Sequence, residues 1–203
     1  LRARHEAENV GKEQLSKDFW YRCGNAAIAL RREPKLAEIL SDGRAEVPLT
    51  AIDPETGVLL KGKLDWVSNA FTVDVKTYSQ QRGKSIDKTI ADAIWYEDYA
   101  RQAYFYCLLR SLQPNSGMKT PGQAPPFVLA FVESEEPFEV RLREIRAKHL
   151  GQPSLLWERA RVQVREHIRT YAEYSAHYGI SPWRSAQPIS ELMDEDISQL
   201  AFS

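Results

Sequence analysis

The stretch Gly62-Lys63-Leu64-Asp65-Trp66-Val67-Ser68-Asn69-Ala70-Phe71-Thr72-Val73-Asp74-Val75-Lys76-Thr77 decides the fold of this chain. It predicts two short strands, because β-branched and aromatic residues are frequent on both sides of the turn signal Ser68-Asn69. Side chains alternate between the two faces of a strand, so Asp74 and Lys76 project to the same side. Asp65, on the partner strand, comes close to Asp74 across the hairpin.

Two carboxylates and an ammonium group therefore gather on one face of the predicted hairpin. Neighbouring carboxylates are costly unless positive charge compensates them, and oxygen ligands of this kind suit Mg²⁺ or Mn²⁺. A metal held by Asp65, Asp74 and the main-chain carbonyl of Val75 fits phosphodiester hydrolysis, since it lowers the pKa of a bound water. Lys76 then orients that water or stabilises charge on the phosphate. The alternative is an exposed hairpin with ordinary surface charges, and the spacing alone leaves both interpretations open.

Three further residues are candidates for the same site. Glu46 lies on the strand before the hairpin and either adds a third carboxylate to the metal site or protects a sheet edge from aggregation. Gln102 and Tyr106 lie one helical turn apart in an aromatic stripe of the predicted helix 86–112. They either contact a substrate phosphate or base, or form a satisfied polar pair between helix and sheet.

Positive charge is concentrated in a stripe at a spacing of four residues, Arg161, Arg165 and Arg169. Like charges at that spacing repel each other, so we expect counter-charges from DNA phosphates or from acids such as Glu158 and Glu166. A solvated helix face is the favoured interpretation. Two lysines that precede or begin the helix 86–112 are interpreted in the same way, namely Lys84 and Lys88.

Composition indicates a folded globular chain. The chain has 203 residues, of which 43% are hydrophobic, and a formal net charge of −1. This balance excludes a protein that coats nucleic acid by bulk positive charge, so any DNA contact must come from a local patch. Cys23 and Cys107 have no metal-binding or disulfide spacing, and both are predicted as buried free thiols of a reducing, cytoplasmic compartment. The sequence shows no signal peptide and no apolar run that could span a membrane. We expect surface or structural roles for the four histidines, His5, His149, His167 and His177.

The order of the predicted elements is helix, meander, long helix, hairpin and helix. Helices are predicted over 3–31, 35–40, 86–112, 143–149 and 154–178, and strands over 45–52, 58–67, the hairpin, 127–132 and 137–142. Loops are predicted over 77–85 and 113–126. This order favours an α/β fold with a small central mixed sheet flanked by helices. We expect one domain over 1–180 and a C-terminal tail over 181–203.

Taken together, these motifs resemble the PD-(D/E)XK nuclease superfamily, in its exodeoxyribonuclease VIII-like and phage-type exonuclease branch. The matching residues are Thr56-Gly57, Gly62-Lys63-Leu64-Asp65, Asp74-Val75-Lys76-Thr77, the Gln-x-x-x-Tyr of Gln102 to Tyr106, and Pro137-Phe138-Glu139-Val140. The resemblance implies a restriction-endonuclease-like core with Asp65 and Asp74 as metal ligands and Lys76 as the catalytic lysine. It places Gln102 and Tyr106 in substrate contact or in support of the site.

The resemblance also implies partners and a setting. It implies Mg²⁺, with Mn²⁺ as a substitute, DNA as substrate, a ring-shaped homo-oligomer and a single-strand annealing partner in a bacterial or phage-infected cell. The family usually has a metal-binding histidine in an upstream Gly-x-Ala-x-His helix. Gly24-Asn25-Ala26-Ala27-Ile28 fits that pattern except that Ile28 stands where the histidine should be. We therefore expect the histidine helix before Leu1, in an N-terminal part that is missing here.

The sequence predicts a Mg²⁺-dependent double-strand DNA exonuclease that acts in recombination or repair. Two alternatives share the scaffold: a non-catalytic DNA-binding or assembly subunit, and an endonuclease that acts on branched or nicked DNA. A structural α/β module without a nucleic-acid role is the weakest alternative.

Overall fold

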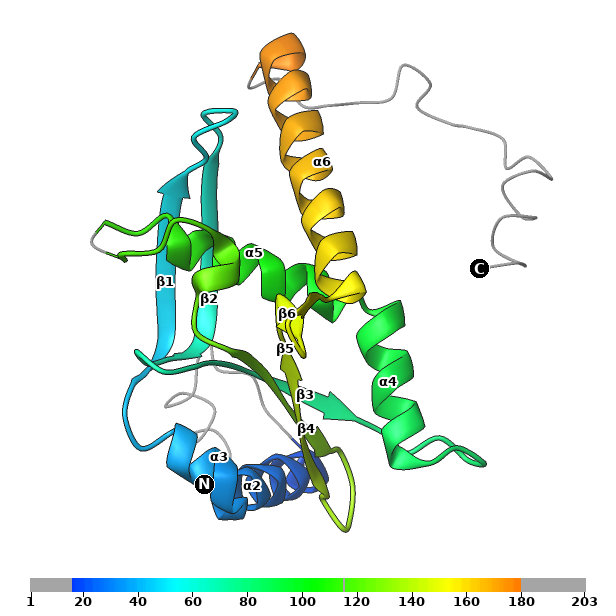
Figure 1. The fold of residues 1–203 in the computed structure, drawn as a ribbon. Coiled ribbons are helices and arrows are strands. Elements are labelled where there is room, and N and C mark those ends of the chain that lie inside the picture. Colours follow the sequence, from blue (N-terminus) through cyan, green and yellow to red (C-terminus); the bar gives the residue numbers. More distant parts are fainter. Residues whose placement is uncertain (1–15, 115, 180–203) are drawn as a thin grey trace, which may run out of the picture.

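A computed structural model describes residues 16–114 and 116–179 of the chain (Figure 1). The helices are α2 (Lys17–Arg32), α3 (Pro34–Ile39), α4 (Ile86–Tyr96), α5 (Tyr99–Ser111), the short 3-10 helix η1 (Pro121–Gln123) and α6 (Leu155–Tyr178). The strands are β1 (Arg44–Ile52), β2 (Leu59–Val67), β3 (Thr72–Tyr78), β4 (Phe127–Glu133), β5 (Val140–Ile145), β6 (Lys148–His149) and β7 (Gln152–Pro153).

The centre of the fold is a five-stranded mixed sheet with the strand order β1-β2-β3-β4-β5. Strands β3 and β4 are parallel, and the other neighbouring pairs are antiparallel. β4 is buried along its whole length, as expected for a continuous apolar run inside a sheet. The predicted α/β class, with a small mixed sheet flanked by helices, is confirmed.

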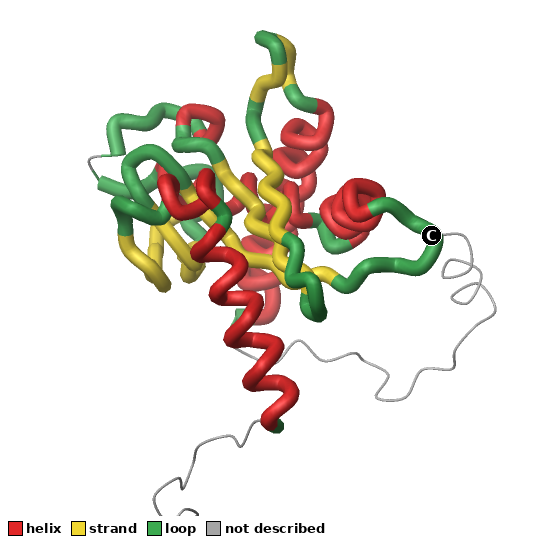
Figure 2. The backbone as a smooth tube through the Cα atoms, turned by 90° about the horizontal axis from the view of Figure 1, so that it is seen from below, coloured by secondary structure: helices red, strands yellow, loops and turns green. Residues whose placement is uncertain are grey.

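Helices cover both faces of this sheet, and each face has its own apolar cluster (Figures 1 and 2). On one face, Leu36 and Ile39 of α3 pack with Val73 and Val128. On the other face, α4, α5 and α6 pack over Leu129, Phe131 and their neighbours. Since side chains alternate along β3, Val73 faces α3 while Asp74 faces α5. The candidate site therefore lies on the α5 side.

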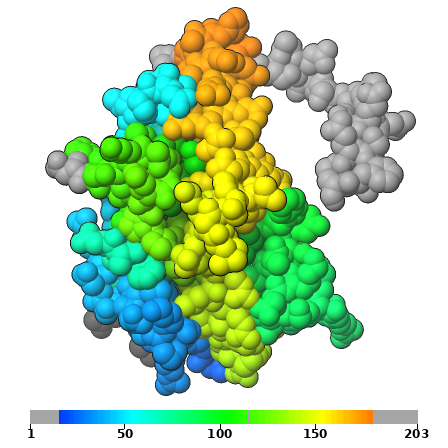
Figure 3. Space-filling view, viewed as in Figure 1, coloured from blue at the N-terminus to red at the C-terminus, as the bar shows by residue number. Residues whose placement is uncertain are grey.

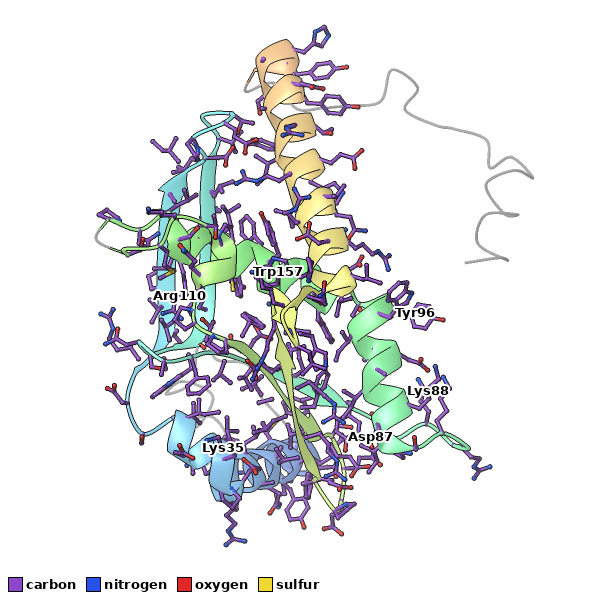
Figure 4. The ribbon with its side chains drawn as sticks, in the orientation of Figure 1. Lys35, Asp87, Lys88, Tyr96, Arg110 and Trp157 are labelled. Atoms are coloured by element: carbon purple, nitrogen blue, oxygen red, sulfur yellow. The ribbon has the colours of Figure 1, made fainter. Side chains whose placement is uncertain are left out.

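The predicted helix 86–112 is divided into two, which corrects the sequence interpretation. α4 ends at Tyr96, and Asp98 has φ 52°, in the left-handed region that interrupts a helix before α5 begins at Tyr99. The aromatic stripe predicted along a single helix is therefore divided between α4 and α5. Trp95 is 52% exposed and lies under Arg159 of α6, with 4.0 Å from the guanidinium carbon to the ring centroid. Figure 4 shows Tyr96, at the end of α4, pointing away from the body.

The predicted helix 143–149 is also wrong. Its first three residues belong to β5, which pairs antiparallel with β4 from Val132↔Val140 to Phe127↔Ile145, and its last two form β6. Without β5, the hydrogen-bonding edge of the buried strand β4 would have no partner, so pairing overrides the helical tendency of arginine and glutamate here. The hairpin partner predicted at 137–142 is correspondingly shifted to Val140–Ile145.

Of the two predicted buried thiols, Cys107 is buried and Cys23 is exposed. α2 has no buried residue, and in its described part the apolar face predicted for 3–31 reaches the core through the partly buried Leu30, which packs against the cluster under α3. The first part of that predicted helix and the predicted C-terminal tail lie outside the described residues. Within 16–114 and 116–179, none of the helices combines the length and the apolar character needed to cross a membrane.

Candidate active site

The candidate site lies where β2 and β3 separate. The two strands pair only at Trp66↔Val73 and Val67↔Thr72. At the next position along the ladder, Oδ2 of Asp65 accepts a hydrogen bond from the backbone N–H of Val75, with a distance of 2.9 Å. The Asp65 side chain thus satisfies a backbone donor where the ladder ends. This places its carboxylate beside Asp74, as the hairpin pattern predicted.

Asp74 is the buried centre of the site, with 3% of the residue exposed. Its Oδ1 accepts a hydrogen bond from Nε2 of Gln102 at 2.9 Å. Its Oδ2 lies 2.8 Å from Nζ of Lys76 in an ion pair. Within the described part of the chain, however, Oδ2 accepts no hydrogen bond of regular geometry. A buried carboxylate oxygen is rarely left in this state, and such an atom fits a role as a cation ligand.

The charge on Asp74 is disfavoured by its surroundings. Burial raises the pKa of the Asp74 carboxyl above its ordinary value. The ion pair with Lys76 and the hydrogen bond from Gln102 act in the opposite direction, while the nearby Asp65 raises the pKa further. The net shift is upward, so Lys76 compensates the buried negative charge only in part. A second positive charge would stabilise both carboxylates.

Lys76 is held between Asp74 and an aromatic ring. Its Nζ lies 4.6 Å from the ring centroid of Tyr99, within the range of a cation–π interaction. The ring of Tyr99 in turn packs on Phe131 of β4, with 6.0 Å between centroids. The side chain of Lys76 is 20% exposed, so its ammonium group lies at the surface of the site, within reach of a ligand.

The other half of the predicted Gln-x-x-x-Tyr pair supports the backbone of the site. The hydroxyl of Tyr106 donates a hydrogen bond to the carbonyl of Lys63 at 3.2 Å. The Tyr106 ring and Leu109 pack against Gly62, where an added Cβ would lie 2.7 Å from Leu109 Cδ1. Gly62 therefore lets α5 approach β2 closely. Both predicted substrate-binding side chains have protein partners, and their contact with substrate stays a prediction.

Glu46 does not complete a cluster of three carboxylates. Its side chain forms an ion pair with Lys63, and its backbone has φ 54° at the position opposite Asp65. In the described ranges, no group of three or more histidine, cysteine, aspartate or glutamate side chains is arranged to hold a metal ion. Metal binding by Asp65, Asp74 and the Val75 carbonyl therefore stays a prediction.

The arginine stripe of α6 is matched by acids. Arg161 pairs with Glu158, Arg165 with Asp53, and Arg169 with Glu55, at 2.7, 2.5 and 3.1 Å. Counter-charges were expected, but Asp53 and Glu55 come from the β1–β2 hairpin, which the sequence did not indicate. Lys84 and Lys88 both pair with Asp92.

Arg110 is a residue that the sequence analysis missed. It lies near the end of α5 (Figure 4) and is only 8% exposed. It donates hydrogen bonds to the carbonyls of Phe71 and Ser68 and to Oγ1 of Thr72. Burial lowers the pKa of its guanidinium, which these carbonyl oxygens nevertheless satisfy. Arg110 thereby fixes the turn from which β3 carries Asp74 into the site. An arginine directly after Leu108-Leu109 was the available signal.

Comparisons with known proteins support the fold. No family model matches the sequence, and no curated protein matches it. A crystal structure of a Eubacterium rectale protein, provisionally named an exonuclease, aligns with a TM-score of 0.62 and 15% identity, over 98% of this chain and 73% of that one. The structure of SSO0001 aligns with a TM-score of 0.38 and 16% identity, over 81% and 60% of the two chains, which is too weak to support an argument. At 15% identity the first likeness shows the fold alone.

Proposed function

We propose that this protein is a metal-dependent deoxyribonuclease, and specifically an exonuclease that digests double-stranded DNA from its ends. The observation that carries the proposal is the state of Asp74: buried, incompletely hydrogen-bonded, and paired with Lys76 beside a second carboxylate. The fold shared with a protein provisionally named an exonuclease supports the same reaction class. The charge balance of the site calls for a cation, and its polar groups suit a phosphodiester.

Asp65 and Asp74 would hold Mg²⁺ or Mn²⁺, because hard cations prefer carboxylate oxygens. When bound, the metal supplies Lewis acidity toward the phosphate and lowers the pKa of water. The protein's own contribution comes from Lys76 and Gln102. Gln102 fixes the orientation of Asp74, and the Lys76 ammonium stabilises negative charge that develops on the phosphate oxygens. Tyr99 keeps that ammonium in place.

Digestion of linear duplex DNA in Mg²⁺ tests the proposal. We expect Lys76→Ala to abolish digestion under conditions where circular dichroism shows a folded variant, and to unfold at a lower temperature than the wild type, because Asp74 is left buried without its ion pair. Lys35→Ala is the matched control, since Lys35 pairs only with the exposed Glu38 on α3. Digestion by Lys76→Ala at the wild-type rate would refute the assignment. Covalently closed circular DNA should remain whole, and its cleavage would indicate an endonuclease instead.

A non-catalytic DNA-binding subunit is the second candidate, favoured by the two-carboxylate site and by Ile28 at the expected histidine position. Titration with Mn²⁺ separates the two functions. A catalytic site should bind Mn²⁺ in a way that Asp74→Asn abolishes, and binding should weaken as protons compete for the raised-pKa carboxyl at low pH. Absence of Asp74-dependent binding would favour the non-catalytic subunit. Assembly into a ring and an annealing partner belong to the same proposal, and the mass of the purified protein in solution tests the ring.

A further inference from the structure

A groove of about 590 Å³ lies between the upper part of β2, the beginning of α5 and the middle of α6. Figure 1 shows the β1–β2 hairpin and α6 both extending above α5. Apolar side chains form most of its wall, including Leu59 from β2, Phe105 from α5 and Ile168 from α6. Leu59 is 67% exposed, so the groove presents apolar surface that residues 16–114 and 116–179 do not cover.

The groove and the candidate active site share one side chain, Gln102. Gln102 lines the groove and also donates its amide hydrogen bond to Asp74. A ligand in the groove would therefore reach the side chain that orients the buried carboxylate.

Acidic and basic side chains lie at different parts of the groove. At the α5 end, Asp98 is paired with Arg101 at 2.9 Å, and Glu97 lies next to it. On the β2 wall, Lys61 has no ion pair with an acidic side chain among the described residues, and His167 of α6 also lines the groove. A polyanionic backbone is thus favoured along the β2 wall and disfavoured at the start of α5.

We infer that this groove holds an unpaired nucleic-acid strand beside the scissile phosphate, with bases against the apolar wall and phosphates near Lys61. Apolar and aromatic walls bind unstacked bases, each of which contributes about 1–3 kcal/mol in other proteins. A duplex keeps its base faces stacked and offers phosphates, sugars and base edges instead. The inference rests on the proposed function for its substrate, and adds that an end must be unpaired to engage the site.

Fluorescence anisotropy with labelled oligo(dT) tests the inference without cleavage, in EDTA. We expect wild-type protein to bind the single strand more tightly than a duplex of the same length. Leu59→Glu should weaken single-strand binding about tenfold or more, because it places a negative charge on the apolar wall. Leu59 is exposed at a hairpin, so the variant should unfold at the wild-type temperature.

Val162→Glu is the matched control, because Val162 is 53% exposed on α6 and does not line the groove. It should bind as the wild type does. Unchanged binding by Leu59→Glu, an equal loss in Val162→Glu, tighter binding of the duplex, or no binding by the wild type would each overturn the inference. Hydrolysis is measured separately in Mg²⁺. Failure of hydrolysis with groove-dependent binding intact would reject the proposed activity alone, and the reverse would reject the groove alone.

Discussion

Two buried aspartates in this protein, Asp53 and Asp74, have carboxyl pKa values that are shifted in opposite directions. Each is at most 3% exposed, and each has a cationic partner within 3 Å, Arg165 or Lys76. Burial alone would raise the pKa of Asp53, but hydrogen bonds from Thr56 and Arg165 and the guanidinium charge outweigh it, and the pKa is lowered. At Asp74 burial prevails, and the pKa is raised.

The difference lies in the number and quality of the hydrogen bonds. Oδ1 of Asp53 accepts from Arg165, and Oδ2 accepts from both the backbone N–H and the hydroxyl of Thr56, at 3.2 and 2.8 Å. The pair joins the hairpin tip to α6, and Figure 3 shows these two regions in contact. Oδ2 of Asp74 has only the ion pair with Lys76. A satisfied aspartate stabilises the fold, whereas an incompletely satisfied one marks a ligand site.

Asp74→Asn gives the largest expected effect. Loss of the negative charge should lower nuclease activity at least about 10²–10³-fold, the range seen when one preorganised catalytic group is removed. The variant should unfold at a higher temperature than the wild type at pH 7, because the fold disfavours the charged form. Digestion rates and calorimetry check the two parts. A destabilised Asp74→Asn would contradict the assignment of Asp74 as an incompletely compensated charge.

Asp53→Asn should lower the stability of the fold and leave the nuclease activity unchanged. It leaves Arg165, with a side chain 17% exposed, without its buried partner, and breaking such a pair costs about 3 kcal/mol of unfolding free energy. Activity per folded molecule should be retained. The control is Glu55→Gln, since Glu55 is 48% exposed and such pairs contribute at most about 1 kcal/mol. Urea denaturation of both variants measures the difference, and equal losses would show that burial of Asp53 is unimportant.

The two aspartates should also respond oppositely to pH. The folded pKa of Asp53 is lowered, so its stabilisation is present above the unfolded value of 3.8 and is lost as pH falls through the folded value. The folded pKa of Asp74 is raised, so its charge destabilises the fold increasingly as pH rises from 3.8 through the folded value. Unfolding free energies across this range should therefore show Asp53→Asn converging on the wild type in acid. Asp74→Asn should diverge from it toward neutral pH, and parallel curves would refute the opposite shifts.

Sequence patterns correctly predicted the strands and the turn that depend on interactions between neighbouring residues. The alternation of apolar and polar side chains around Asp74 and the turn signal Ser68-Asn69 predicted the strands β2 and β3. The same pattern predicted that Asp65 lies close to Asp74. The turn forms because Oγ of Ser68 accepts the N–H groups of Ala70 and Phe71. The apolar run 127–132 likewise gave the buried strand β4.

Long-range contacts explain what was missed. Asp53 meets Arg165 across 112 positions of sequence, and no local period indicates such a pair. The break at Asp98 involves neither glycine nor proline, so the sequence carried no ordinary signal for it. β5 forms a strand because it pairs with the edge of β4 that β3 does not occupy. The charged residues of β5 do not by themselves predict a strand. The groove beside Gln102 depends on β2, α5 and α6 together.

The smallest expected effect concerns how the site holds Lys76. Tyr99→Leu removes the ring beneath the ammonium, and a cation–π contact of about 1–2 kcal/mol corresponds to a loss of roughly tenfold in kcat. Tyr99→Phe keeps the ring and its packing on Phe131, so it should retain nearly full activity. Comparing kcat with thermal unfolding for both variants separates positioning from stability. If Phe and Leu lose activity equally, the hydroxyl rather than the ring matters, and if neither loses any, Asp74 alone positions Lys76.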